Sequence, residues 1–238
     1  MNIKEKPETF NIPDVVARIE HYSRRVHITS LDALHLCEVW GAFNGAGEQR
    51  RAIDQSPAHL AAAVYEDAVF LKLVVVLVRL LDQTRGGNIL KSDRISFPVI
   101  YSLLSLPGVS EIFIARASNS IGTILEGLEP NQAVEMVRKC IESFGERLHR
   151  LNTEKPNRAA QMRSFRDVNF AHELRKNEAK ASPLIRYIPE MLSEIMALME
   201  NVQKIVSGSP SNYWPHGEAG ESAMQLWNAV ETVFSNPG

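Results

Sequence analysis

A long apolar segment in the first half of the chain limits the folds that this sequence can adopt. Between Ala61 and Leu81 the apolar residues fall nearly all round a helix, which is typical of a helix at the centre of a bundle. Its most apolar part begins at Ala68 and is interrupted by Lys72 and Arg79. This part is shorter than the ~20 apolar residues that a membrane span needs. The segment therefore predicts a buried helix, and we expect no membrane association.

Capping residues, prolines and glycines divide the rest of the chain into further helical segments, and no run shows the alternation of a strand. The pattern predicts a helix from Ser56-Pro57 to about residue 84, and a break at Ser30, which we expect to be an N-cap. The stretch 45–55 is predicted as a loop or a frayed connection. The other predicted helices cover residues 14–26, 32–43, 97–106, 111–125, 130–151, 156–180, 189–206 and 221–234. The predicted fold class is all-α.

The helical segments group into three predicted parts. We expect an N-terminal helical extension over residues 1–55, a central helical bundle over 56–208, and a C-terminal linker and docking helix over 209–238. The last helix carries an apolar stripe at helical spacing, which favours docking on the chain's own core over docking on a partner. The stripe consists of Trp227, Val230, Val233 and Phe234.

Cysteine usage and the N-terminus indicate a cytoplasmic location. Only Cys37 and Cys140 are present, without a paired spacing, so a disulfide framework and a cysteine-rich zinc site are both disfavoured. The first residues lack the apolar core of a signal peptide. A chain of 238 residues can bury a stable core without disulfides or bound zinc. We expect a chain that needs no cofactor and no metal.

Charge is unevenly distributed along the chain. The net charge is −2, but nine Arg or Lys and four Asp or Glu lie between Arg147 and Lys180, which leaves a local balance of +5. A basic segment on an otherwise acidic protein is typical of a surface that faces a polyanion. The alternative is an ordinary solvated helix face, which charge alone favours.

Common catalytic motifs are absent from the sequence. There is no Walker A pattern, no G-x-G-x-x-G, no H-E-x-x-H and no G-x-S-x-G. His21, His27 and His35 do not form an i, i+4 pair of metal ligands. These absences disfavour P-loop enzymes, dinucleotide-binding enzymes, zincins and α/β-hydrolases.

Arg166 and His172 are the strongest candidates for chemistry. They lie in the basic segment, with the polar Asp167 and Asn169 between them. RNA cleavage without a metal needs a base for the 2′-hydroxyl and an acid for the leaving 5′-oxygen, and histidine serves in either role. It also needs charge stabilisation at the phosphate, which the guanidinium fork provides. One Arg and one His form an incomplete set, and two copies in a dimer would complete it.

Helix geometry sets a condition on this pair. Arg166 and His172 are six positions apart in the sequence. On an ideal helix this places their side chains about 120° apart around the helix axis and about 9 Å apart along it. The two side chains can meet in one copy only if the helix is distorted or begins within the segment. Otherwise a second chain must supply the residue that acts with each of them. The alternative is structural: His172 shares a face with Phe165 and Val168, as a core histidine would, and Arg166 is solvated beside Arg163.

The segment FRDVNFAHEL resembles the signature of the HEPN superfamily (higher eukaryotes and prokaryotes nucleotide-binding), with Arg166, Asp167 and His172 at the matching positions. The stretches VLVRLLDQ, from Val76, and ISFPVIYSLL, from Ile95, resemble its abortive-infection branch. The resemblance covers roughly residues 56–207. It implies an all-helical, usually dimeric bundle with Arg and His at a cleft between protomers. Many members are metal-independent ribonucleases, and others are inactive RNA-binding or structural modules.

The leading hypothesis is therefore a HEPN-type endoribonuclease that acts as a homodimer in phage defence or a toxin–antitoxin-like system. In this hypothesis, His172 is the general acid or base and Arg166 stabilises the phosphate. Asp167 orients one of these two side chains, and Asn169 forms a hydrogen bond with the phosphate or the ribose. The expected partners are RNA and an antitoxin or regulatory protein. The alternative is a non-catalytic helical module that binds RNA or protein. Weaker candidates for RNA-backbone contacts are Arg163, Arg175 and Lys176.

Overall fold

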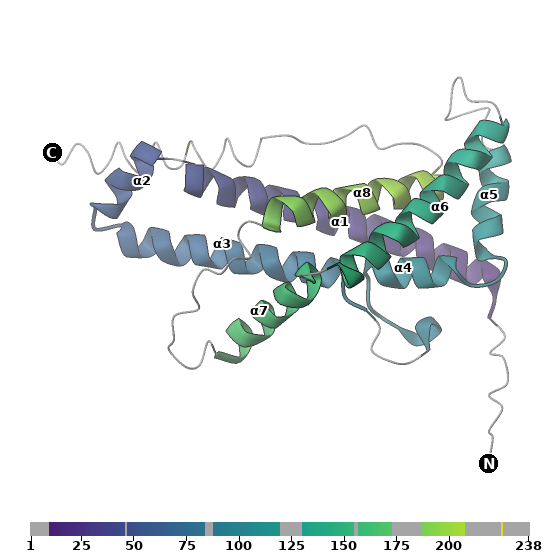
Figure 1. The fold of residues 1–238 in the computed structure, drawn as a ribbon, viewed down its shortest axis with the longest axis horizontal. Coiled ribbons are helices and arrows are strands. Elements are labelled where there is room, and N and C mark those ends of the chain that lie inside the picture. The colour runs from purple at the N-terminus through teal and green to yellow at the C-terminus, as the bar shows by residue number, and fades with distance from the viewer. Residues whose placement is uncertain are drawn as a thin grey trace, which may run out of the picture. The chain divides into compact units, whose positions relative to one another are not determined.

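The computed structural model describes residues 10–45, 47–83, 88–119, 130–154, 157–172, 187–207 and 225. These residues form an all-α bundle, shown in Figure 1, and no strand occurs among them. The predicted fold class is confirmed. The elements are α1 (Ile12–Gly45), α2 (Gly47–Asp54), α3 (His59–Leu80), η1 (Ile89–Lys91, a 3-10 helix), α4 (Phe97–Leu104), α5 (Val109–Asn119), α6 (Pro130–Thr153), α7 (Arg158–His172) and α8 (Ile188–Ser207).

The chain divides into two compact units that are interleaved along the sequence. Unit 1 contains residues 1–27, 81–150 and 197–211, and unit 2 contains residues 28–80, 151–196 and 212–238. Helices α1 and α8 each contribute residues to both units. The limits of the two units differ from the domain boundaries near residues 55 and 208 that the sequence predicts. The predicted division into three parts stays a prediction.

Aromatic packing forms the centre of unit 1. The ring of Phe144, in α6, meets the rings of Phe97 and Tyr101, in α4, edge to face at centroid distances of 6.1 and 5.6 Å. Phe97 and Phe144 are completely buried. The predicted helices at 97–106 and 130–151 are therefore confirmed as α4 and α6, and their shared aromatic core fixes one against the other.

Helices α4 and α5 are joined by a tight turn, as the Pro107-Gly108 pair predicts. Gly108 has a φ of +80°, in the left-handed region that favours glycine. Among the described helices, none is long and apolar enough by itself to cross a membrane. Helices α4 and α5 reach the required length and composition only when taken together, and a bend of 86° separates them.

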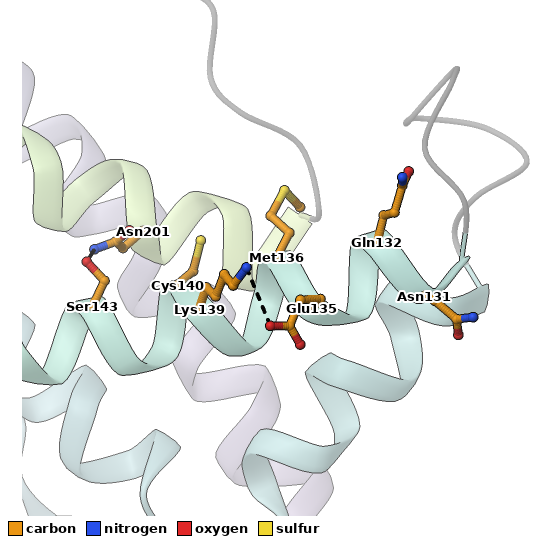
Figure 2. Close-up of a pocket in the computed structure, with 8 residues that line it drawn as sticks. All are labelled: Asn131, Gln132, Glu135, Met136, Lys139, Cys140, Ser143 and Asn201. Atoms are coloured by element: carbon orange, nitrogen blue, oxygen red, sulfur yellow. Dashed lines mark hydrogen bonds and ion pairs between the residues drawn. The ribbon is translucent and has the colours of Figure 1, made fainter.

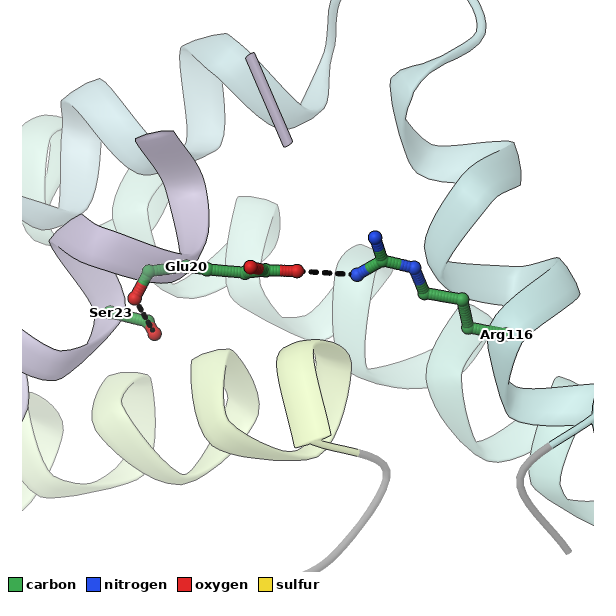
Figure 3. Close-up of polar contacts among 3 residues, drawn as sticks. All are labelled: Glu20, Ser23 and Arg116. Carbon is green, nitrogen blue, oxygen red and sulfur yellow. Dashed lines mark hydrogen bonds and ion pairs between the residues drawn. The ribbon is translucent and has the colours of Figure 1, made fainter. Parts of the chain in front are cut away.

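Polar contacts attach the N-terminal part of α1 to other elements of unit 1. Figure 3 shows Arg116, in α5, paired with the carboxylate of Glu20, while the Ser23 hydroxyl donates to the Glu20 carbonyl within α1. The hydroxyl of Tyr22 also donates to the carbonyl of Ser92 at 3.0 Å. These contacts join segments that are about 70 to 100 residues apart in the sequence, and so they fix the register of α1 in this unit.

A partly buried histidine, His27, is expected to make the stability of unit 1 pH-dependent. The side-chain amide of Gln203 forms a hydrogen bond with Nδ1 of His27. Burial lowers the pKa of His27 from its ordinary value of 6.5. The unfolded chain therefore binds the proton more readily, and the free energy of unfolding should fall as the pH drops below 6.5 towards the lowered value.

Urea unfolding at a series of pH values tests this prediction. The His27→Gln variant should lose part of the decline in unfolding free energy that the wild type shows below pH 6.5. The control is His21→Gln, at an exposed position of the same helix, which should keep the wild-type slope. Equal slopes in the wild type and His27→Gln would contradict the role of His27.

Two predictions about the N-terminal part are wrong. Ser30 is not an N-cap but a fully buried residue inside the unbroken α1, and the predicted loop at 45–55 contains α2. The reason for the first error is that the buried stripe of α1 continues through Ser30 at helical spacing, from Val26 to Ala33. The predicted helix at 221–234, except for residue 225, and the predicted extensions to 125 and 180 lie outside the described residues.

Unit 2 has a core of its own between α1, α2, α3 and α7. Phe43, Ile53, Ala62 and Val69 form a buried cluster. Partly buried residues of α1 pack against this cluster, and among them the Trp40 ring lies 5.5 Å from the ring of Phe70. The apolar helix predicted at 57–84 is therefore confirmed as α3, although it ends at residue 80.

Candidate functional site

Helix α7 carries the predicted catalytic segment. It begins at Arg158, and the side chain of Asn157 caps it by accepting a hydrogen bond from the Ala160 amide at 2.8 Å. This cap lies just after the predicted start at residues 153–156. Helix α7 packs on α3 within unit 2, where Phe165 meets Phe70 edge to face at 5.7 Å. The core of unit 2 thus determines which face of α7 is buried.

Arg166 lies on the buried side of α7. It follows Ala159 by seven residues, which places the two within about 20° on an ideal helix. Ala159 and Met162 are buried, and the Arg166 side chain is only 22% exposed. Arg166 is thus half-buried, and the alternative in which it is a solvated residue beside Arg163 stays a prediction. A guanidinium that is partly removed from water needs a polar partner.

Asp167 provides such a partner. Its Oδ1 accepts a hydrogen bond from Nε of Arg166 at 2.9 Å and lies 2.7 Å from Nη2 of the same guanidinium. The Asp167 side chain is 57% exposed, so the pair reaches from the buried side of α7 to solvent. Two contacts from one planar fork restrict the orientation of the guanidinium. The structure therefore brings together two of the four predicted catalytic residues.

The remaining predicted residues are placed only in part. Asn169 and His172 belong to the helical backbone of α7, and their side chains lie outside what is described. Arg163 is half-buried in the same helix, and Arg175 and Lys176 lie beyond the described residues. Since α7 is unbroken from Arg158 to its end at His172, the helix does not begin within the segment. Arg166 and His172 of one copy therefore stay about 120° apart around an ideal helix.

Part of the basic segment is already neutralised within unit 2. Arg158 forms an ion pair with Glu190, and its guanidinium lies 5.3 Å from the centroid of the Tyr187 ring. This residue attaches α7 to the start of α8. In the described parts of the chain, no group of three or more His, Cys, Asp or Glu residues has the arrangement of a metal site.

The end of the first upstream segment that carried the resemblance, at Asp82 and Gln83, is joined in unit 1 to the start of the second. Ser96 is fully buried, and its hydroxyl donates to the backbone carbonyl of Asp82 at 2.6 Å. Arg94 donates to the carbonyl of Gln83 at the same distance. Ser96 is the N-cap residue of α4, but its side chain bonds the preceding segment and not its own helix.

A pocket of about 660 Å³ lies in unit 1 beside α6 and α8. Figure 2 shows Cys140 and Met136 in it, with Ser143 and Asn201 in contact at 3.4 Å at one end. Burial raises the pKa of the Cys140 thiol. None of the predicted site residues lines this pocket. Its described lining residues lie in α6, apart from Asn201 in α8, and they match no sequence motif.

Comparisons with models of protein families, with curated proteins and with solved structures found no match to this chain. The family resemblance therefore rests on the residues of the chain itself. Among these, the Arg166–Asp167 pair is the part of the candidate site with defined side-chain geometry.

Proposed function

We propose that this chain is a HEPN-type, metal-independent endoribonuclease that acts as a homodimer in phage defence or in a toxin–antitoxin-like system. One observation carries the proposal: Arg166 is half-buried and held by Asp167 on the helix that carries His172. An oriented guanidinium on the same helix as a histidine provides both charge stabilisation and proton transfer.

Two copies of α7 would supply a complete set of groups. His172 of one copy takes the proton from the 2′-hydroxyl, and the 2′-oxygen then attacks the phosphorus. His172 of the other copy gives a proton to the departing 5′-oxygen. Arg166 stabilises the added negative charge on the phosphoryl oxygens, Asp167 holds its guanidinium, and Asn169 bonds the phosphate or ribose. The products are a 2′,3′-cyclic phosphate and a 5′-hydroxyl.

This mechanism predicts both the cofactor requirement and the ends of the products. A labelled structured RNA should be cut at an unchanged rate in excess EDTA, because no proposed step uses a metal. The 3′ ends should carry a cyclic phosphate, which acid opens to a mixture of 2′- and 3′-monophosphates. Loss of cleavage in EDTA, or 3′-hydroxyl ends, would contradict the mechanism.

The second candidate function is a non-catalytic module that binds RNA or a protein. The observation that favours it is the pairing of Arg166 with Asp167, since a guanidinium that is already neutralised also serves a purely structural role. In the same assay this candidate predicts intact RNA. Retention of the RNA on the protein should then fall steeply as salt rises, because released counterions drive such binding.

A further inference from the structure

The side chain of Asn157 joins the end of α6 to the start of α7. Its Nδ2 donates to the backbone carbonyl of Asn152 at 2.6 Å, and its Oδ1 accepts from the backbone amide of Ala160 at 2.8 Å. Helix α6 ends at Thr153 and α7 begins at Arg158, so the two contacts belong to different helices. Both contacts lie within unit 2.

Each contact satisfies a backbone group that its helix leaves without a partner. The last four carbonyls of an α-helix and its first four amides have no hydrogen bond within the helix. Asn152 lies in the last turn of α6, and Ala160 lies in the first turn of α7. An asparagine side chain carries both a donor and an acceptor, so Asn157 serves both helix ends at once.

Other contacts hold α7 in place but constrain its direction less. Phe165 meets Phe70 of α3 edge to face, which holds one point of α7 against the core. Arg158 pairs with Glu190, but these side chains are 31% and 54% exposed, and exposed ion pairs of this kind are weak. Asn157 lies about 12 Å before Phe165 along the axis of α7. Two points held at this separation determine the direction of the helix.

We propose that Asn157 is a positioning residue for the candidate ribonuclease site, because it sets the direction in which α7 leaves α6. The effect on catalysis rests on the proposed function, whereas the effect on the helix does not. His172 lies seven residues beyond Phe165, about 10.5 Å along the axis. A turn of about 10° around the Phe165 contact therefore moves the backbone of His172 by about 1.8 Å. A misplacement of about 1 Å lowers the rate of a positioned reaction about 10²-fold.

The substitution Asn157→Asp separates positioning from simple helix capping. Aspartate accepts the amide of Ala160 as asparagine does and is an equally good N-cap residue. Its carboxylate has no hydrogen to donate to the carbonyl of Asn152, so only the contact with α6 is lost. A capping role alone predicts the wild-type rate for this variant. The positioning role predicts that kcat for RNA cleavage falls about 10–100-fold, while KM stays within about threefold of the wild-type value.

Two further variants serve as controls for Asn157→Asp. Gln161→Glu adds a carboxylate to the exposed side of the first turns of α7 and leaves the Asn157 contacts in place, so its kcat should stay within about twofold of the wild-type value. Asn157→Ala removes both contacts, so it should lose kcat and also lower the temperature of thermal unfolding. A fall in kcat as large in Gln161→Glu as in Asn157→Asp would overturn the proposal.

A distance measurement tests the direction of α7 without relying on RNA cleavage. Spin labels are attached to ketone-bearing unnatural residues at Lys72 in α3 and Gln161 in α7, which are both exposed and both in unit 2. Pulsed EPR of the full-length chain should give a distance distribution that shifts or broadens by about 1–2 Å in Asn157→Asp.

The two readouts separate failure of this proposal from failure of the proposed function. An unchanged distance distribution in Asn157→Asp, or a wild-type kcat in that variant, would overturn the positioning role. The ribonuclease itself would then stand if the wild type cuts RNA. If the wild type cuts no RNA, a changed distribution still supports the role of Asn157 in setting α7, and the failure lies with the proposed ribonuclease.

Discussion

Replacing Arg166 by lysine is expected to lower the rate of RNA cleavage by about 10²–10³-fold, although the positive charge remains. Nε and Nη2 of Arg166 both contact Oδ1 of Asp167, so the carboxylate holds the plane of the guanidinium. Lysine has a single ammonium group on a flexible stem and cannot keep this orientation while it contacts a phosphate. The proposed ribonuclease requires that oriented fork in the transition state.

The matched control for this change is Arg163→Lys, one turn earlier in the same helix. A contact with the RNA backbone at that position needs only charge, so the rate should change by no more than about threefold. Both variants should show wild-type helicity and thermal unfolding. Equal activity of Arg166→Lys and the wild type would remove Arg166 from the proposed mechanism.

Replacing Phe144 by alanine should lower the free energy of unfolding of unit 1 by about 3–5 kcal/mol. The ring is completely buried and meets both Phe97 and Tyr101, so its removal leaves a cavity that these rigid neighbours cannot fill. This loss is a large fraction of the stability of an ordinary domain. Urea unfolding followed by circular dichroism measures it.

The control is Ile112→Ala, on the partly exposed side of α5 in the same unit. It removes an aliphatic side chain that is already 37% in water, so the unfolding free energy should change by about 1 kcal/mol or less. A similar loss in both variants would show that Phe144 is not the centre of this core.

The helices with a strong apolar or capping signal could be predicted from the sequence, and several of their ends could not. Helices α3, α4 and α6 follow directly from apolar spacing and from proline and glycine positions. The break predicted at Ser30 failed because a capping residue is also compatible with a helix interior when the buried stripe continues through it. Helix α2 was missed because it is only eight residues long and mostly polar, and glycines lie at its start.

The candidate site was predictable as a set of residues in one helix, but its environment was not. Sequence spacing places Arg166 and His172 on α7, and the structure adds that Arg166 is half-buried and bonded to Asp167. The packing of α7 on α3, where Phe165 meets Phe70, joins residues 95 positions apart and could not be read from local spacing. The pocket around Cys140 was missed because its described lining residues, in α6 apart from Asn201 in α8, match no motif.

The most direct test of the proposed ribonuclease compares the wild type with His172→Ala on a labelled structured RNA, in EDTA and over a range of pH. The wild type should cut the RNA with a bell-shaped pH profile, as expected when one histidine acts as base and another as acid. His172→Ala should cut it at least about 10²-fold more slowly. Cleavage by His172→Ala at the wild-type rate, or no cleavage by either protein with helicity intact, would contradict the assignment of His172.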